Sequence, residues 1–161
     1  MKYLYFYPEK CTGCRQCSIA CSLKHFGECN PKAGAISIVR DEFDRYELQF
    51  VCMQCEDPKC VDACMTNALY KDEDGIVKRN EDKCIGCRMC VAACPYAAIN
   101  SLKDEIIKCD LCDGDPVCVK YCSTNAIVYE EETKELVARR KGMADKLLKS
   151  EPEKDNWHYK K

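Results

Sequence analysis

Four cysteines lie within eleven residues near the N-terminus, in the stretch CTGCRQCSIAC. Two residues separate the first cysteine from the second and the second from the third, and three residues separate the third from the fourth. Similar groups of four occur three more times, so sixteen of the seventeen cysteines belong to a repeat. Thiols at this density either bind metal ions or form a disulfide framework.

The four groups, numbered here in chain order, have two variants. Sets one and three share one spacing and carry a glycine before the second cysteine, Gly13 or Gly86. Sets two and four have a longer middle gap and carry an Asp-Pro pair shortly before the third cysteine. Set one is Cys11, Cys14, Cys17 and Cys21; set two is Cys52, Cys55, Cys60 and Cys64; set three is Cys84, Cys87, Cys90 and Cys94; set four is Cys109, Cys112, Cys118 and Cys122.

This spacing favours 4Fe-4S clusters. Three closely spaced thiols in one loop can converge on three corners of a cubane, and in two-cluster bacterial ferredoxins the fourth cysteine binds the other cluster. Zinc sites usually combine two separated pairs of ligands, and haem attachment needs a histidine directly after Cys-x-x-Cys, where neither His25 nor His158 lies. Sixteen ligands, four to each cluster, predict four clusters.

The cysteine loops require short elements to position them. The three residues before each fourth cysteine are expected to open a short helix, and the segments between the sets read as β-hairpins. Residues 68–78 alternate around Asp74-Gly75, a typical hairpin turn. Two alternating runs within 22–51 predict a second hairpin, and 126–138 a third, by its equivalent place after set four. The fold class is therefore expected to be α+β, with a polar and partly helical segment after about residue 141.

The sequence offers few aliphatic and phenylalanine side chains for a hydrophobic core. Leu, Ile, Val and Phe supply only 31 of 161 residues, which is low for a folded protein. Disorder would also require a large net charge, and the net charge is only -2. Cluster binding must then supply part of the folding free energy.

The N-terminus lacks a signal-peptide core and no apolar run is long enough for a membrane span, so a cytoplasmic location is expected. The 25 basic and 27 acidic residues argue against nucleic acid as a partner.

The four motifs, with the opening KYLYFYPEKCTGCRQCSIACSLKHFGECNP, resemble the four-cluster iron–sulfur subunits of molybdenum and tungsten enzyme complexes, the dimethyl-sulfoxide-reductase beta-subunit type. The short chain is most similar to the small subunits of tungsten aldehyde oxidoreductases and class II benzoyl-CoA reductases, enzymes of anaerobic metabolism. The resemblance covers about residues 3–138. It implies two ferredoxin-like modules: an inner module of about 50–107, and an outer module of about 1–21 plus 108–138. Residues 22–50 would be a hairpin insertion and 139–161 a C-terminal tail.

The resemblance also implies which cysteines share a cluster. The outer sets pair with each other, and so do the inner sets. Spacing alone equally allows set one to pair with set two. The implied ligand groups are Cys11, Cys14, Cys17 and Cys122; Cys109, Cys112, Cys118 and Cys21; Cys52, Cys55, Cys60 and Cys94; and Cys84, Cys87, Cys90 and Cys64.

By this resemblance the protein is a non-catalytic electron-transfer subunit. Its partners would be a larger catalytic subunit, with a tungsten or molybdenum pterin, and a further redox subunit or ferredoxin. The sequence contains no phosphate-binding loop and no constellation typical of a substrate site. A freestanding, diffusible polyferredoxin is the main alternative, and a redox-sensing iron–sulfur protein is a third.

One cysteine remains outside the sets. Cys29 is expected to be a small buried hydrophobic residue, the alternative being a functional thiol. Two segments are candidates for docking to a partner: residues 22–51, and residues 139–161 with the apolar side chains Met143, Leu147, Leu148, Trp157 and Tyr159.

Overall fold

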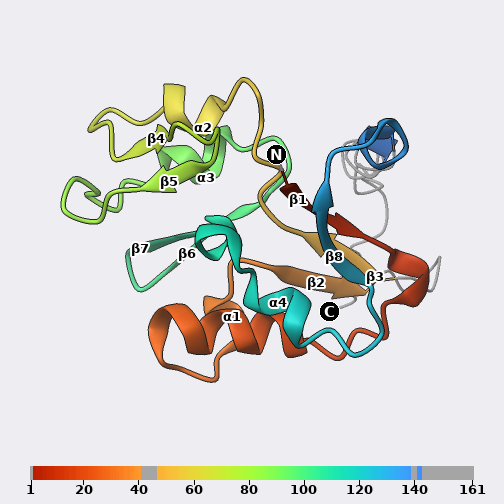
Figure 1. Cartoon of the computed structure of the whole chain (residues 1–161). Coiled ribbons are helices and arrows are strands. Elements are labelled where there is room, and N and C mark those ends of the chain that lie inside the picture. The colour runs from red at the N-terminus through yellow and green to blue at the C-terminus, as the bar shows by residue number, and fades with distance from the viewer. Residues whose placement is uncertain (1, 41–46, 139–140, 143–161) are drawn as a thin grey trace, which may run out of the picture.

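Four two-stranded antiparallel sheets, each small, make up the β structure of the computed structural model, which describes residues 2–40, 47–138 and 141–142. Three are hairpins between consecutive strands, and the fourth joins the two ends of the described chain (Figure 1). The pairs are β1 (Lys2–Phe6) with β8 (Ile127–Glu131), β2 (Ser37–Arg40) with β3 (Glu47–Phe50), β4 (Leu69–Lys71) with β5 (Val77–Arg79), and β6 (Ile99–Leu102) with β7 (Glu105–Lys108).

Each cysteine set has one α-helix, and each helix begins one residue before the third cysteine of its set. The helices are α1 (Gln16–Phe26), α2 (Lys59–Asp62), α3 (Met89–Ala93) and α4 (Val117–Lys120). Short 3-10 turns occur at η1 (Pro8–Lys10), η2 (Pro31–Ala33) and η3 (Leu111–Gly114). The expected short helices are therefore confirmed. The first is longer, so residues 22–26 continue a helix before Gly27 ends it with a left-handed backbone.

Helices from distant parts of the sequence pack in pairs. Helix α1 contacts α4, and α2 contacts α3. Figure 1 shows α1 beside α4, which also contacts β8, while α2 and α3 lie with β4 and β5 at the other end of the molecule. The arrangement brings the first and last cysteine sets together, and the two middle sets together.

Sulfur makes up much of the interior. One buried group combines residues such as Leu4, Phe6, Ile36 and Ile127 with four cysteines, Cys17, Cys21, Cys109 and Cys118. A second group combines Leu69, Ile99 and Ile106 with Cys90, and four further cysteines pack against it: Cys60, Cys64, Cys84 and Cys94. The α+β class and the small conventional core expected from the sequence are both confirmed.

The hairpin predictions have mixed outcomes. The hairpins within 68–78 and 22–51 are observed as β4–β5 and β2–β3, but the hairpin at 126–138 is wrong. Strand β8 pairs instead with β1, whose Leu4, Tyr5 and Phe6 are buried. Residues 134–138 are helical because Thr133 caps them: its Oγ1 accepts a hydrogen bond from the Leu136 amide at 3.3 Å. The sequence reasoning also missed strand β1 and the β6–β7 hairpin.

Among the described residues, no helix has the length and apolar character needed to cross a bilayer. The docking candidates Met143, Leu147, Leu148, Trp157 and Tyr159 lie outside the described residues, as does the tail expected at 139–161 apart from residues 141–142.

Candidate metal centres

The loops of sets one and three are built alike. Gly13 and Gly86 have φ angles of 68° and 67°, and Arg15 and Arg88, two residues further on, are also left-handed. A Cβ at Gly86 would meet the Asp104 carbonyl oxygen at 2.6 Å. Glycine is therefore needed both for the backbone conformation and for the close approach of a neighbouring segment. The sequence marks both positions by the glycine before the second cysteine of sets one and three.

The packing of α1 on α4 brings the thiols of sets one and four together. Cys118 of set four interacts electrostatically with Cys21 and Cys17 of set one as well as with Cys112 of its own set. Cys21, on the second turn of α1, interacts with Cys112. The fourth cysteine of set one thus lies among the thiols of set four. Cys11 and Cys122 pack against the same buried group, whereas Cys14 is exposed.

The packing of α2 on α3 brings sets two and three together in the same way. Cys60 interacts with Cys52 and Cys55 of its own set and with Cys94, the fourth cysteine of set three. In return, Cys90 of set three interacts with Cys84 of its own set and with Cys64, the fourth cysteine of set two. The last thiol of each middle set therefore lies close to the other set. Cys87 is exposed.

Backbone amides donate hydrogen bonds to the fourth cysteine of three sets. The Ala35 amide lies 3.3 Å from Cys21 Sγ, the Ala68 amide 3.2 Å from Cys64 Sγ, and the Ala98 amide 3.4 Å from Cys94 Sγ. Hydrogen bonds to sulfur stabilise negative charge on a thiolate, and in iron–sulfur proteins they help to set the reduction potential.

Burial makes several of these thiols poor acids when no metal is bound. It raises the pKa of Cys17 and of Cys60 to about 11, and that of Cys118 to about 12. A metal that binds such a thiol displaces its proton, which couples cluster binding to folding. All seventeen cysteines lie in the described part of the sequence and none of them is in a disulfide, and most of the sixteen in the sets belong to the two buried groups or pack against them. This donor set fits 4Fe-4S clusters.

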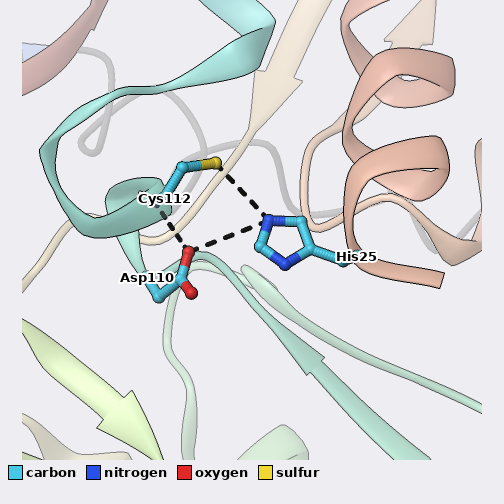
Figure 2. A group of neighbouring side chains, drawn as sticks. All are labelled: His25, Asp110 and Cys112. Carbon is cyan, nitrogen blue, oxygen red and sulfur yellow. Dashed lines mark hydrogen bonds and ion pairs between the residues drawn. The ribbon is translucent and has the colours of Figure 1, made fainter.

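A histidine contacts one of the set-four cysteines. Figure 2 shows the His25 ring, from the last turn of α1, directed toward Cys112 and Asp110. His25 Nε2 lies 3.4 Å from Cys112 Sγ and 3.9 Å from Asp110 Oδ1, and Asp110 Oδ1 also accepts a hydrogen bond from the Cys112 amide at 2.8 Å. Burial opposes ionisation of Cys112, but the hydrogen bond from His25 and the Val117 backbone leave the pKa of that thiol below its usual value.

Sequence reasoning found no role for His25, because its partner lies 87 residues away. His25, Asp110 and Cys112 together could also hold a metal ion. Because Cys112 already belongs to a cysteine set, we interpret His25 as a hydrogen-bond donor to its sulfur.

The remaining cysteine does not behave as expected. Cys29 follows the end of α1 and is exposed, so the prediction of a small buried hydrophobic residue is wrong. The turn after Gly27 is held instead by Ser22, whose Oγ donates to the Glu28 carbonyl at 2.7 Å and accepts from the Asn30 amide at 3.2 Å. This turn leaves the Cys29 side chain on the surface.

Comparisons with known proteins agree with these motifs. The family model described as a 4Fe-4S dicluster domain matches residues 43–132, and one described as a 4Fe-4S binding domain matches residues 8–26. The polyferredoxin-like subunit of aliphatic sulfonate oxidoreductase from Pyrococcus furiosus is 44% identical over 123 residues, which is 74% of this chain and 70% of that relative. The B subunit of anaerobic dimethyl sulfoxide reductase from Escherichia coli is 36% identical over 151 residues, with 80% and 73% covered.

One solved structure, the active-site complex BamBC of benzoyl-coenzyme A reductase with zinc, contains a polypeptide that is 26% identical and has a TM-score of 0.44, with 93% of this protein and 91% of that polypeptide covered. The family match covers more than half of the sequence, and the two relatives above align with most of it. The protein therefore belongs to the 4Fe-4S dicluster family, as a ferredoxin-like iron–sulfur protein homologous to the B subunit of dimethyl sulfoxide reductase.

Proposed function

We propose that this protein is a non-catalytic electron-transfer subunit, which carries four 4Fe-4S clusters and relays single electrons between a catalytic oxidoreductase subunit and a second redox partner. The observation that carries the proposal is the reciprocal arrangement of the thiols. The last cysteine of set two lies near set three, and that of set three lies near set two. Exchange of the fourth ligand is the arrangement of two-cluster ferredoxins.

The proposed ligand sets follow this reciprocal arrangement. The outer pair of clusters is bound by sets one and four, with Cys21 and Cys122 exchanged, and the inner pair by sets two and three, with Cys64 and Cys94 exchanged. The groups are Cys11, Cys14, Cys17 and Cys122; Cys109, Cys112, Cys118 and Cys21; Cys52, Cys55, Cys60 and Cys94; and Cys84, Cys87, Cys90 and Cys64. The contacts of α1 with α4 and of α2 with α3 support this pairing over the pairing of set one with set two.

The two pairs of clusters form a single series in this proposal. Cys52 packs against the buried group that contains Cys109 and interacts electrostatically with that thiol. The set-two and set-four clusters are therefore the neighbours at the junction of the pairs, and the set-three and set-one clusters are the ends. The exposed Cys87 and Cys14 belong to these two end clusters, where electrons would enter and leave.

The same division defines the proposed modules and partner. The inner module comprises about 50–107, and the outer module about 1–21 with 108–138, closed by the β1–β8 pair. Two relatives are named as parts of oxidoreductases, which supports a larger catalytic partner. We propose that the partner contains tungsten or molybdenum bound to a pterin, by the resemblance to that class of complex. We propose a cytoplasmic location, where reducing conditions would keep the ligand cysteines from forming disulfides before iron binds.

The test is purification of the tagged protein from its native host without oxygen, followed by measurement of iron, tungsten and molybdenum. About sixteen irons on this subunit, in a complex with a larger metal-pterin subunit, is the expected result. Sixteen irons on the isolated polypeptide would instead identify a diffusible polyferredoxin. About eight irons would show that two of the proposed ligand sets are wrong.

A further inference from the structure

Four hydrogen bonds form a closed ring at the junction of the two proposed modules. Lys108 Nζ donates to the Val77 carbonyl at 2.6 Å and to the Cys109 carbonyl at 2.9 Å. Gln54 Nε2 donates to the same Cys109 carbonyl at 2.9 Å, and Gln54 Oε1 accepts from the Val77 amide at 2.9 Å. The ring joins the set-two loop, strand β5 and the first cysteine of set four.

Most of the ring is buried, Lys108 is half-buried, and the polar groups of the ring are paired. Gln54 is 3% exposed and lies between two set-two cysteines with a left-handed φ of 47°, while Val77 and Cys109 are also buried. An unpaired amide or ammonium at such a position would be costly. The two hydrogen bonds to backbone carbonyls therefore hold the Lys108 ammonium at the junction.

That point lies beside the Cys109 backbone, and its charge acts on thiols of two different proposed clusters. Burial raises the pKa of Cys60, in set two, and of Cys109, in set four, and the positive charge of Lys108 opposes the rise at both thiols. Cys52 of set two also interacts with Cys109. A single fixed positive charge thus acts on both clusters at the centre of the proposed series.

Nearby carboxylates are engaged elsewhere. Asp110 and Asp113 line the same cavity as Lys108, a space of about 260 Å³. Asp113 pairs with Lys78 at 2.8 Å, and Asp110 accepts the Cys112 amide. Within the described part of the sequence, no carboxylate forms an ion pair with Lys108, so its charge is left to act on the thiolates.

We propose that the charge of Lys108 raises the reduction potentials of both central clusters. Gln54 supports this arrangement, because it donates to the same Cys109 carbonyl as Lys108. The inference rests on the proposed ligand sets. Reduction adds negative charge to a cluster, so a fixed cation favours the reduced form. The charge would make the two central clusters easier to reduce than the same clusters without it, and it would act on the two end clusters much less because they are further away.

The test compares Lys108→Met and Lys108→Gln, which remove the charge, with Lys108→Arg, which keeps it. Lys103→Met removes an exposed lysine from the turn of the same β6–β7 hairpin and is the matched control. Iron content is measured first, and all four cluster potentials are then followed by electron paramagnetic resonance at one fixed pH. Cys60→Ser and Cys118→Ser identify the signals of the two central clusters.

In the neutral variants, the reduction equilibrium constants of the two central clusters are expected to fall by roughly tenfold, a shift of about 59 mV for one electron. The other two clusters, the Lys108→Arg variant and the Lys103→Met control should stay near the wild-type potentials. A neutral variant without effect, or one that shifts all four clusters equally, would overturn the proposal.

If Lys108→Met fails to retain iron, the cluster potentials are measured on Lys108→Gln instead. Loss of iron from both neutral variants, with Lys108→Arg fully loaded, would support a requirement for the charge, whereas equal loss from all three would contradict it. Because the potentials are measured on this subunit, the result does not depend on the identity of the catalytic partner. Failure of the proposed function would instead appear as low iron content in the wild-type protein, or as about sixteen irons on a polypeptide that is purified without a larger subunit.

Discussion

The imidazole of His25 directly contacts the sulfur of a proposed cluster ligand, Cys112. Its Nε2 lies 3.4 Å from Cys112 Sγ, and both the neutral ring and the cation can donate a hydrogen bond from this atom. Replacement by phenylalanine keeps an aromatic ring but removes the donor. We expect His25→Phe to lower the potential of the set-four cluster alone, by roughly tenfold in its reduction constant.

The measurement is a redox titration monitored by electron paramagnetic resonance at one pH, with iron content as a check on loading. His25→Gln, which can still donate a hydrogen bond, should retain a potential closer to that of the wild-type protein. If phenylalanine and glutamine gave equal shifts, the ring volume rather than the hydrogen bond would be responsible.

The exposed Cys29 gives a second prediction at this scale. Because Cys29 lies outside every set and on the surface, Cys29→Ser should leave the iron content unchanged. Cys60→Ser is the comparison, since Cys60 lies among three other cysteines of its proposed cluster, and we expect it to lose up to about four irons. The measurement is the amount of iron per polypeptide in each variant. Loss of iron from Cys29→Ser would refute the proposed ligand sets.

The cysteines were predictable from the sequence because ligand spacing within one loop is local information. His25, Gln54 and Lys108 were not. His25 acts on a thiol 87 residues away, and Gln54 binds a carbonyl 55 residues away. Such contacts depend on how the modules pack, which spacing within a motif does not encode.

At the scale of elements, two glycines with the same backbone conformation differ in their surroundings. Gly27 and Gly86 have φ angles of 66° and 67°, but a Cβ at Gly27 would meet nothing within 4 Å, whereas one at Gly86 would lie 2.6 Å from the Asp104 carbonyl oxygen. Gly27→Ala should cost only the left-handed conformation, about 1–2 kcal/mol. Gly86→Ala should cost about 1–3 kcal/mol more, because the β6–β7 turn must move.

Thermal unfolding of the two iron-loaded variants without oxygen measures this difference. Gly86→Ala should have the lower midpoint and should release iron sooner. Equal midpoints would mean that the set-three loop moves freely away from Asp104 and that the close approach has no energetic importance.

The fold was predictable to the extent that its elements are local. The helices after the cysteine loops and the hairpins β2–β3 and β4–β5 are specified by neighbouring residues. The pairing of β1 with β8 is not, since it joins the two ends of the described sequence. The place of 126–138 after set four favours a hairpin, but capping by Thr133 starts a helix there and leaves β8 to pair with β1.

At the scale of the whole molecule, a core lined with thiols makes the fold dependent on its metal. Removal of iron by a chelator under reducing conditions should abolish cooperative folding, since protonated thiols replace metal bonds that join distant segments. Far-ultraviolet circular dichroism and the loss of a sharp thermal transition measure the effect. Restoring iron and sulfide should recover both, and an iron-free protein that kept its sharp transition would show that aliphatic packing suffices.

The pairing of the first strand with the last also has a consequence for synthesis on the ribosome. The inner pair of cysteine sets lies within one continuous stretch, so it can fold as soon as that stretch has emerged. Set one, although made first, lacks β8 and the set-four thiols until most of the protein has been translated. The earliest cysteines to leave the ribosome are therefore among the last to find their partners, and they need protection from oxygen or from premature metal binding for most of translation.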